Sequence, residues 1–290
     1  MLSHKRPKVV RSGFRDFDLV NGGFLPGSLV VLAATTGGGK SAMSVQLALN
    51  MVKTGHNVCI VPLEMSTKEV LSRAVSNISD ITVGKYLYPP LNDNKPPLTK
   101  KEIQRTKDRW GAFEKLLVSL KSSLRIYEPE ADLTMDELLT VLQPHNDTVV
   151  IVDYISLLRG VDGDDSWRQL GNAARLAKIW ARNNKRVVIL IAQLSEQGAI
   201  KYSRTIKEHA DNMWSWIYTE ENKETGILEI TQQKARNQRE FNFQLGHDFS
   251  VMKLFDLDVS PVNDEQPFTG KEGKGVKEKK GKKKVWSSAN

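Results

Sequence analysis

A glycine-rich stretch between an apolar run and a helical pattern constrains the fold of this chain more than any other feature. The stretch is Ala34–Ser41, and it directly follows the apolar run Leu29–Ala33. Glycines allow backbone N–H groups to turn inward around phosphate oxygens, and the helix that follows presents its positive N-terminal end to them. The stretch therefore predicts a nucleoside triphosphate site, although the usual motif begins with glycine where this chain has Ala34.

Two side chains of this phosphate loop have expected chemical tasks. Lys40 is expected to reach the β- and γ-phosphates, and the Ser41 hydroxyl is expected to ligate Mg²⁺. The residues expected to bind the nucleotide are Thr35, Thr36, Gly37, Gly38, Gly39, Lys40 and Ser41.

Apolar runs typical of strands recur along the chain and alternate at first with helix-length patterns. The runs are Leu29–Ala33, Val58–Leu63, Leu124–Tyr127, Val149–Val152, Val187–Ala192, Ile227–Thr231, Phe241–Leu245 and Val251–Phe255. The helical patterns are Ser41–Lys53, Thr67–Ser79, Thr99–Lys121, Thr134–Leu142 and Trp167–Asn183, and loops are expected at Gly84–Pro97, Arg159–Asp165 and Ser195–Ser203. Strands that are apolar throughout and separated by helices indicate an α/β fold with a parallel sheet buried on both faces. The last three runs have no helix between them, so we expect them to be antiparallel.

Length and charge suggest the domain boundaries. The 290 residues carry a net charge of +8, and much of it lies in a Gly- and Lys-rich C-terminal stretch that follows a short acidic one. We expect an arm at residues 1–12, one folded domain at 13–256, and a disordered tail at 257–290 that either solubilises the protein or contacts nucleic acid. Because no apolar run approaches a membrane-spanning length and no signal peptide is visible, we expect a cytoplasmic protein without a membrane partner.

Three polar residues follow apolar runs at the positions where an open α/β sheet forms its binding crevice. Asp153 follows the fourth run and is expected to hold Mg²⁺ through bound water. Glu64 follows the second run and is the candidate base that activates the attacking water. Gln193 follows the fifth run, and its amide can both donate and accept near the γ-phosphate, which suits a sensor.

Several short motifs give the chain a resemblance to a known family. They are Gly22-Gly23-Phe24-Leu25-Pro26-Gly27, Leu63-Glu64-Met65-Ser66, Val152-Asp153-Tyr154, Gln193-Leu194 and Lys234-Ala235-Arg236-Asn237. Together with the phosphate loop they resemble the DnaB family of replicative hexameric helicases, over most of the folded domain. The resemblance implies a RecA-like motor domain that binds ATP and Mg²⁺ between subunits of a ring. It also implies 5′ to 3′ movement on single-stranded DNA at replication forks, in a bacterium or a phage-infected cell.

The resemblance also assigns further site residues. In the family a Lys-x-Arg element reaches the γ-phosphate bound by the adjacent subunit, so Arg236 is expected to be an arginine finger and Lys234 its companion. Residues two apart in a strand share one face, which fits a pair aimed across one interface. The loops after the fourth and fifth runs are expected to face DNA. Their candidate contacts with the phosphate backbone are Arg168, Lys201 and Arg204.

Differences from the family pattern leave alternatives open. Few residues precede Gly13, so the N-terminal domain by which the family contacts primase is not expected here, and the chain is either an excised motor domain or a short member such as one encoded by a phage. Gln238 follows Asn237 where the family often has glycine. A RecA/RadA-like recombination ATPase that forms filaments on single-stranded DNA is the main alternative function. A nucleotide-switched scaffold is another, and a primase or a helicase loader is an expected partner.

Overall fold

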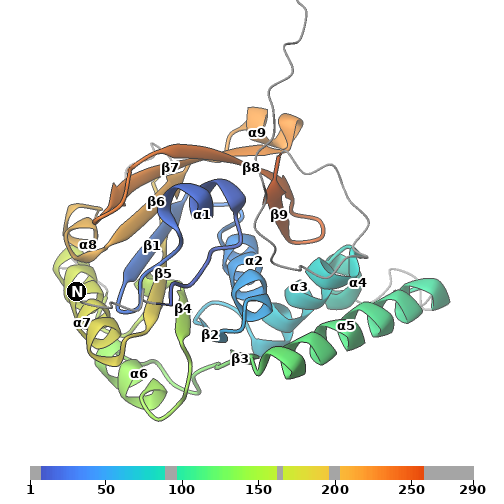
Figure 1. The fold of residues 1–290 in the computed structure, drawn as a ribbon, viewed down its shortest axis with the longest axis horizontal. Coiled ribbons are helices and arrows are strands. Elements are labelled where there is room, and N and C mark those ends of the chain that lie inside the picture. The colour runs from blue at the N-terminus through green and yellow to red at the C-terminus, as the bar shows by residue number, and fades with distance from the viewer. Residues whose placement is uncertain (1–7, 89–96, 162–165, 196–202, 258–290) are drawn as a thin grey trace, which may run out of the picture. The chain divides into compact units, whose positions relative to one another are not determined.

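The computed structural model describes residues 8–88, 97–161, 166–195 and 203–257 (Figure 1). In this part of the chain nine strands form one sheet, in the order β3-β2-β4-β5-β1-β6-β7-β8-β9. The strands are β1 (Leu29–Ala34), β2 (Asn57–Pro62), β3 (Ser123–Ile126), β4 (Val149–Asp153), β5 (Val187–Gln193), β6 (Asn212–Trp216), β7 (Ile227–Ala235), β8 (Asn242–Asp248) and β9 (Lys253–Asp256). Strands β4 and β5 stand between β1 and β2, so the chain passes over two strands between the phosphate loop and β2. In an open α/β sheet, a change in the direction of strand order forms a crevice at the carboxyl ends of the strands.

Six strands, from β3 to β6 in the sheet order, run parallel. Their register places Ala34 beside Gln193 and Pro62 beside Asp153, so the carboxyl ends of β1, β5, β2 and β4 meet at one edge of the sheet. Every residue of β1 and β4 is buried. Burial on both faces explains why these strands are apolar throughout rather than alternating, and it confirms the expected α/β fold.

Helices cover both faces of this sheet (Figure 1). Alternate residues of β1 face opposite ways, because a strand has a period of two. Val30 and Leu32 pack with α2, whereas Leu29 and Val31 pack with α6 and α7. The helices are α1 (Arg15–Asn21), α2 (Lys40–Lys53), α3 (Thr67–Ser79), α4 (Gly84–Leu87), α5 (Lys100–Leu120), α6 (Met135–Leu142), α7 (Ser166–Asn184), α8 (Ser203–His209) and α9 (Glu220–Thr225), and a 3₁₀ turn spans Ile155–Leu157.

Side-chain caps determine where α3, α5 and α6 begin. Ser66, Thr99 and Thr134 each accept a hydrogen bond from the backbone N–H three residues later, and the glutamate at that position bonds back to the cap. Such a reciprocal pair satisfies backbone N–H groups that a helix start leaves without partners. Because Ser66 comes two residues after Glu64, the cap of α3 holds the chain directly beyond the candidate base.

The C-terminal half of the sheet is antiparallel, as the sequence predicts. Strands β6 to β9 pair in turn with opposite directions. Trp214 of β6 is fully buried and packs edge-on against Phe17 and Phe243, with ring centroids 4.6 Å and 5.1 Å away. These aromatic contacts join α1 and β8 to the centre of the sheet.

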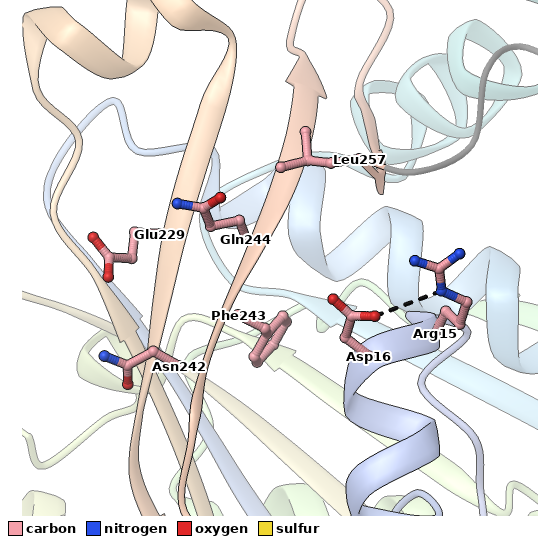
Figure 2. A pocket seen from close by; sticks show the side chains of 7 residues that line it. All are labelled: Arg15, Asp16, Glu229, Asn242, Phe243, Gln244 and Leu257. Atoms are coloured by element: carbon pink, nitrogen blue, oxygen red, sulfur yellow. Dashed lines mark ion pairs between the residues drawn. The ribbon is translucent and has the colours of Figure 1, made fainter. Parts of the chain in front are cut away.

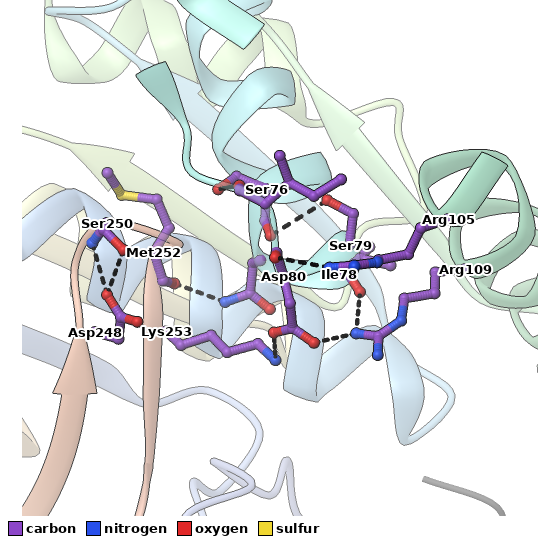
Figure 3. Close-up of polar contacts among 12 residues, drawn as sticks. Ser76, Ile78, Ser79, Asp80, Arg105, Arg109, Asp248, Ser250, Met252 and Lys253 are labelled. Carbon is purple, nitrogen blue, oxygen red and sulfur yellow. Dashed lines mark hydrogen bonds and ion pairs between the residues drawn. The ribbon is translucent and has the colours of Figure 1, made fainter. Parts of the chain in front are cut away.

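The hairpin formed by β8 and β9 is tied to the C-terminal end of α3 (Figure 3). Asp80 ends α3 in the left-handed conformation, and its carboxylate pairs with Lys253 of β9 and Arg109 of α5. The Asn77 side chain donates a hydrogen bond to the carbonyl of Met252 at 2.6 Å. These contacts fix the turn between β8 and β9 against the helix layer.

Several elements differ from the sequence-based expectations. The central strand β6 was not predicted, because its sequence Asn-Met-Trp-Ser-Trp contains no β-branched residue and does not form a long apolar run. Helix α4 occupies part of Gly84–Pro97, which was expected to be a loop. Strand β9 begins at Lys253 rather than at Val251, because Val251 and Met252 belong to the turn. The short helices α1, α8 and α9 were also missed.

The ends of the described chain bear on the expected boundaries. Val10 is buried and forms an isolated antiparallel bridge with Phe24, so this residue of the expected arm packs with the folded part. The tail predicted at 257–290 lies, apart from Leu257, outside the described residues. Among the helices that the structure describes, none combines the length and the apolar character needed to cross a bilayer.

Candidate nucleotide site

The phosphate loop leaves the carboxyl end of β1 and turns directly into α2. Gly37 and Gly39 have φ values of 74° and 75°, a backbone conformation that favours glycine. Gly39 is also the N-cap of α2, so the loop ends at a helix N-terminus with its free N–H groups. The Lys40 ammonium donates to the carbonyls of Ala34 at 3.4 Å and Thr35 at 3.2 Å, and therefore lies within the curve of the loop.

Two aromatic side chains from the C-terminal half of the chain support the loop. The Trp216 indole donates a hydrogen bond to the carbonyl of Gly38 at 2.6 Å. A Cβ atom at Gly39 would lie 2.2 Å from the ring of Phe249, so this ring packs directly on the glycine. The shape of the loop therefore depends on β6 and on the turn after β8.

Both threonines of the loop have hydrogen-bond partners on other elements. The Tyr218 backbone N–H donates to Thr35 Oγ1 at 3.0 Å. The Gln193 side-chain amide donates to Thr36 Oγ1 at 2.9 Å. The structure thus brings Gln193, at the end of β5, into contact with the phosphate loop.

Asp153 is a buried carboxylate beside the start of α2. It is 2% exposed, and it accepts a hydrogen bond from Ser44 Oγ at 3.1 Å. Burial raises the pKa of Asp153, and the neighbouring hydroxyls of Ser44 and Ser41 oppose that shift. Burial also lowers the pKa of Lys40, against the attraction of the Asp153 and Glu64 carboxylates. These three charges are close enough to influence one another.

Glu64 is an exposed carboxylate just beyond the end of β2. Pro62, the last residue of β2, pairs with Asp153, so the two acids lie on neighbouring strand ends. Glu64 lines a hollow of about 250 Å³ together with residues that follow β3, among them Glu128 and Glu130. Its exposure suits a group that must contact a water molecule and the substrate.

The donors near Asp153 fit a magnesium ion that is bound together with a nucleotide. In the described part of the chain no cluster of three or more His, Cys, Asp or Glu residues could hold a metal by itself. Magnesium typically takes one or two carboxylates and completes its shell with substrate phosphates and water. Asp153 and the Ser41 hydroxyl supply hard oxygen atoms next to the phosphate loop, which matches that requirement.

Lys234 and Arg236 lie near the amino ends of the parallel strands, whereas the phosphate loop follows the carboxyl end of β1. Lys234 pairs with Met213 near the start of β6, and β6 runs parallel to β1 with Asn212 beside Val30. Through β6, Lys234 is thus level with Val31 and Arg236 with Leu29, about 10 Å and about 17 Å from the carboxyl end of β1 at the usual rise per residue. The pair is too far from the phosphate loop of its own subunit to contact a nucleotide bound there.

The two basic side chains have different contacts. The Lys234 ammonium donates to the carbonyls of Lys207 at 2.6 Å and Glu208 at 3.0 Å, at the C-terminal end of α8. Arg236 directly follows β7, its side chain is 47% exposed, and its Nη1 lies 3.4 Å from Asp211 Oδ1. Lys234 is therefore anchored on a helix end, which favours a cation, and Arg236 on a carboxylate.

The three candidate DNA contacts do not form one described cluster. Arg168 lies in the first turn of α7 and lines a cavity of about 440 Å³ with Arg159 and residues of α6. Lys201 lies outside the described residues, and Arg204 belongs to α8 with its side chain outside the description.

A further pocket lies between α1 and the β7–β8 pair (Figure 2). It has a volume of about 400 Å³, and none of its lining residues belongs to the phosphate loop. Arg15 and Asp16, neighbours at the start of α1, form an ion pair at 3.5 Å, so their charges compensate each other. The remaining lining residues are Glu229, Asn242, Phe243, Gln244 and Leu257. We assign this pocket no part in nucleotide chemistry.

Sequence reasoning missed three residues that shape the site or its surroundings. Trp216 and Phe249 support the loop, and Asp211 contacts Arg236. Trp216 lies in β6, the strand that was not predicted from strand propensity, and Phe249 lies in the turn after β8. The pairing of β6 with β1 and β7 places Trp216 and Asp211, and the pairing of β8 with β7 and β9 places Phe249, so no local pattern could have indicated these residues.

Replacing Gly39 with alanine tests the contact with Phe249. Left-handed strain alone costs about 1–2 kcal/mol for a residue other than glycine, and overpacking adds about 1–3 kcal/mol. Gly37→Ala is the matched control, because Gly37 has nearly the same φ but open space around its Cβ position. We expect thermal unfolding without nucleotide to show a larger loss of stability for Gly39→Ala. The double variant Gly39→Ala/Phe249→Ala should lose less stability than the sum of its single changes, and simple additivity would contradict the packing contact.

Comparisons with known proteins agree with this geometry. The sequence profile of the family "DnaB-like helicase C terminal domain" matches residues 9–247. The chain is 24% identical over 256 residues to the replicative DNA helicase DnaB of Geobacillus stearothermophilus, which covers 79% of this chain and 52% of that protein. It is 24% identical over 251 residues to the replicative DNA helicase DnaC of Bacillus subtilis, a match that again covers 79% of this chain and 52% of that protein. The chain thus spans about half the length of these curated relatives.

Solved structures show the same fold. One solved ATPase domain superposes with a TM-score of 0.74 at 20% identity, and the match covers 88% of this chain and 94% of that domain. A DnaB-like replicative helicase, described with its interactions with primase, gives a TM-score of 0.74 at 21% identity and covers 87% and 62%. The RadB recombinase gives 0.54 at 14% identity and covers 86% and 100%. The expected RecA-like fold is therefore confirmed. Because the family profile matches most of its length, the chain belongs to the family of DnaB-like helicase C-terminal domains.

Proposed function

We propose that this chain is an ATP-hydrolysing motor domain that works in a homo-oligomeric ring and unwinds duplex DNA during replication. One observation carries the proposal. The phosphate loop and the strand ends that bear Glu64, Asp153 and Gln193 lie at one edge of the sheet, whereas Arg236 lies at the opposite edge. A complete hydrolytic site then requires Arg236 from a neighbouring copy, and membership of a replicative helicase family supports such an assembly.

Within one subunit, each site residue has a separate task in the proposed reaction. Lys40 and the backbone N–H groups of the phosphate loop bind the β- and γ-phosphates of ATP. Glu64 orients and deprotonates the attacking water, and its exposure at the strand end supports that role. Gln193 senses the γ-phosphate from its position against the loop. Asp153 and Ser41 would hold Mg²⁺, which neutralises phosphate charge when it is bound.

The neighbouring subunit completes the site in this proposal. Arg236 acts as an arginine finger on the γ-phosphate, and Lys234 accompanies it. Contacts between one face of a subunit and a different face of the next are heterologous, so they close into a ring or continue as a filament. We propose the ring, as a hexamer, in which hydrolysis at each interface moves one subunit relative to the next.

Movement on DNA extends the proposal to the loops after β4 and β5. Arg168, Lys201 and Arg204 are the proposed contacts with the phosphate backbone of a single strand, and movement is proposed to run 5′ to 3′. A similar structure is described with its primase interactions, which supports primase as a partner here; a helicase loader is another proposed partner. The proposed place of action is the replication fork in the cytoplasm.

A filament-forming recombination ATPase is the second candidate, favoured by the similarity to the RadB recombinase. Electron microscopy of the purified chain with a non-hydrolysable ATP analogue separates the two, with and without single-stranded DNA. We expect closed rings, which would support the helicase motor. Helical filaments that lengthen with added DNA would instead support the recombinase.

Changing Glu64 to glutamine tests its role as the base. The variant keeps the size of the side chain but cannot accept a proton at neutral pH, so ATP hydrolysis should fall by about 100-fold or more while ATP binding stays within about threefold. Glu130→Gln is the matched control, since it removes a carboxylate from the same hollow without touching the proposed chemistry. Turnover would be measured by phosphate release and binding by nucleotide fluorescence. Full hydrolysis by this variant would exclude Glu64 as the base.

Mixing two inactive variants tests whether the site is shared. Arg236→Ala and Lys40→Ala should each lose nearly all hydrolysis, because one lacks the finger and the other a phosphate ligand. A mixed assembly contains interfaces where the phosphate loop of the first variant faces the finger of the second. We therefore expect mixtures to hydrolyse ATP faster than either variant alone, with a maximum at an intermediate ratio. The absence of recovery at every ratio would count against a shared site.

A further inference from the structure

Asp211 joins three parts of the subunit at the edge of the sheet that carries Arg236. It directly precedes β6, and its side chain is 10% exposed. Asp211 Oδ2 accepts hydrogen bonds from the Leu29 backbone N–H at 2.8 Å and from Lys178 Nζ at 2.6 Å. Asp211 Oδ1 lies 3.4 Å from Arg236 Nη1. One largely buried carboxylate thus contacts the first residue of β1, helix α7 and the proposed finger.

Asp211 also fixes the backbone of Arg236. The Arg236 N–H donates to the Asp211 carbonyl at 2.7 Å, which continues the β6–β7 pairing one residue beyond Asn212 and Ala235. The guanidinium presents a planar fork of five N–H donors, and the contact at Nη1 engages one end of that fork. With 47% of the side chain exposed, the finger is held at its base and open at its surface.

The carboxylate also offsets positive charge gathered at this edge. Burial and the nearby Arg236 lower the pKa of Lys234, and the attraction of Asp211 opposes that shift. Lys178 adds a third positive charge on the other side of the same carboxylate. Without Asp211, the cations would repel one another and the long Arg236 side chain would sample more rotamers.

We propose that Asp211 is a positioning residue that holds the Arg236 guanidinium in place before a neighbouring subunit binds, and so sets the rate of hydrolysis in the neighbour's site. The inference rests on the proposed function, because it requires Arg236 to act across an interface. A finger that is already ordered loses less rotamer freedom when it meets the phosphate, and preorganised charge stabilises the transition state best. Asp211 therefore acts on kcat through Arg236 and has no contact with the nucleotide of its own subunit.

The variant Asp211→Asn separates the two sides of this carboxylate. The amide oxygen can still accept hydrogen bonds from Leu29 and Lys178. The NH₂ group then faces the Arg236 guanidinium, and because both groups are hydrogen-bond donors they cannot bond to each other. We expect kcat for ATP to fall by about tenfold, a typical loss for a partner that orients a catalytic group, with KM within about twofold. The double variant Asp211→Asn/Arg236→Ala should be no slower than Arg236→Ala, because residues that act as a unit are not additive. A multiplied loss in the double variant would overturn the inference.

Lys178→Gln is the structural control. It removes the ion pair on the opposite side of Asp211 and leaves Oδ1 beside Arg236. If Asp211 only stabilises the fold, Lys178→Gln should lower the melting temperature and kcat in parallel with Asp211→Asn; if it positions the finger, kcat should stay near the wild-type value. Asp211→Glu provides a second variant should Asp211→Asn unfold, since it keeps the charge but places the carboxylate one methylene farther from its own backbone. The guanidinium is then held in a different position, so kcat should again fall while KM stays within about twofold.

Subunit mixing distinguishes this inference from the proposal on which it rests. Mixtures of Asp211→Asn with Lys40→Ala should recover hydrolysis, because the intact loop of the first variant then faces the intact finger of the second. Recovery with Arg236→Ala but not with Asp211→Asn would overturn the positioning role and leave the shared site standing. Failure of Arg236→Ala itself to recover would overturn the shared site, and the positioning role with it.

Discussion

The parallel register of four adjacent strands is the constraint on which the candidate site depends. Strands β2, β4, β5 and β1 run side by side in one direction, so residues far apart in the sequence reach a single edge. A slip of one residue would turn every side chain of a strand to the other face, where it would meet a different layer of helices. The same dry surroundings shift the pKa values of Lys40 and Asp153. Burial thus sets both the geometry and the electrostatics of the site.

The sequence allowed the parallel half of the fold to be predicted well and the rest less well. Continuous apolar runs identify β1, β2, β4 and β5 because those strands are buried on both faces. Strand β6 is equally buried, but its sequence Asn-Met-Trp-Ser-Trp has no β-branched residue and forms no continuous apolar run. Helix α4 spans a single turn and has no period long enough to recognise. The sequence pattern therefore revealed strands that contain several consecutive buried apolar residues. It missed elements that are short or that lack such a run.

For the site, local patterns and pairing contributed in different ways. The phosphate loop, Asp153 and Gln193 each follow an apolar run, so their meeting at one edge could be predicted. The place of Arg236 at the opposite edge could not, because it depends on which strand β7 joins and in which direction. The contact between Asp211 and Arg236 follows from that same pairing. Resemblance to a family supplied the proposed role of Arg236, and topology supplied the observation that Arg236 lies far from the phosphate loop of its own subunit.

The ring of Phe249 against Gly39 has a consequence for how the chain is made. The phosphate loop is synthesised early, yet the ring that packs on it is among the last residues of the domain to leave the ribosome. A nascent chain that has reached β5 already contains the loop, its lysine and the acidic strand ends, but the support for the loop is still missing. The nucleotide site is therefore assembled only when nearly all of the domain has emerged, and a chain that stops before β8 leaves the loop without this support.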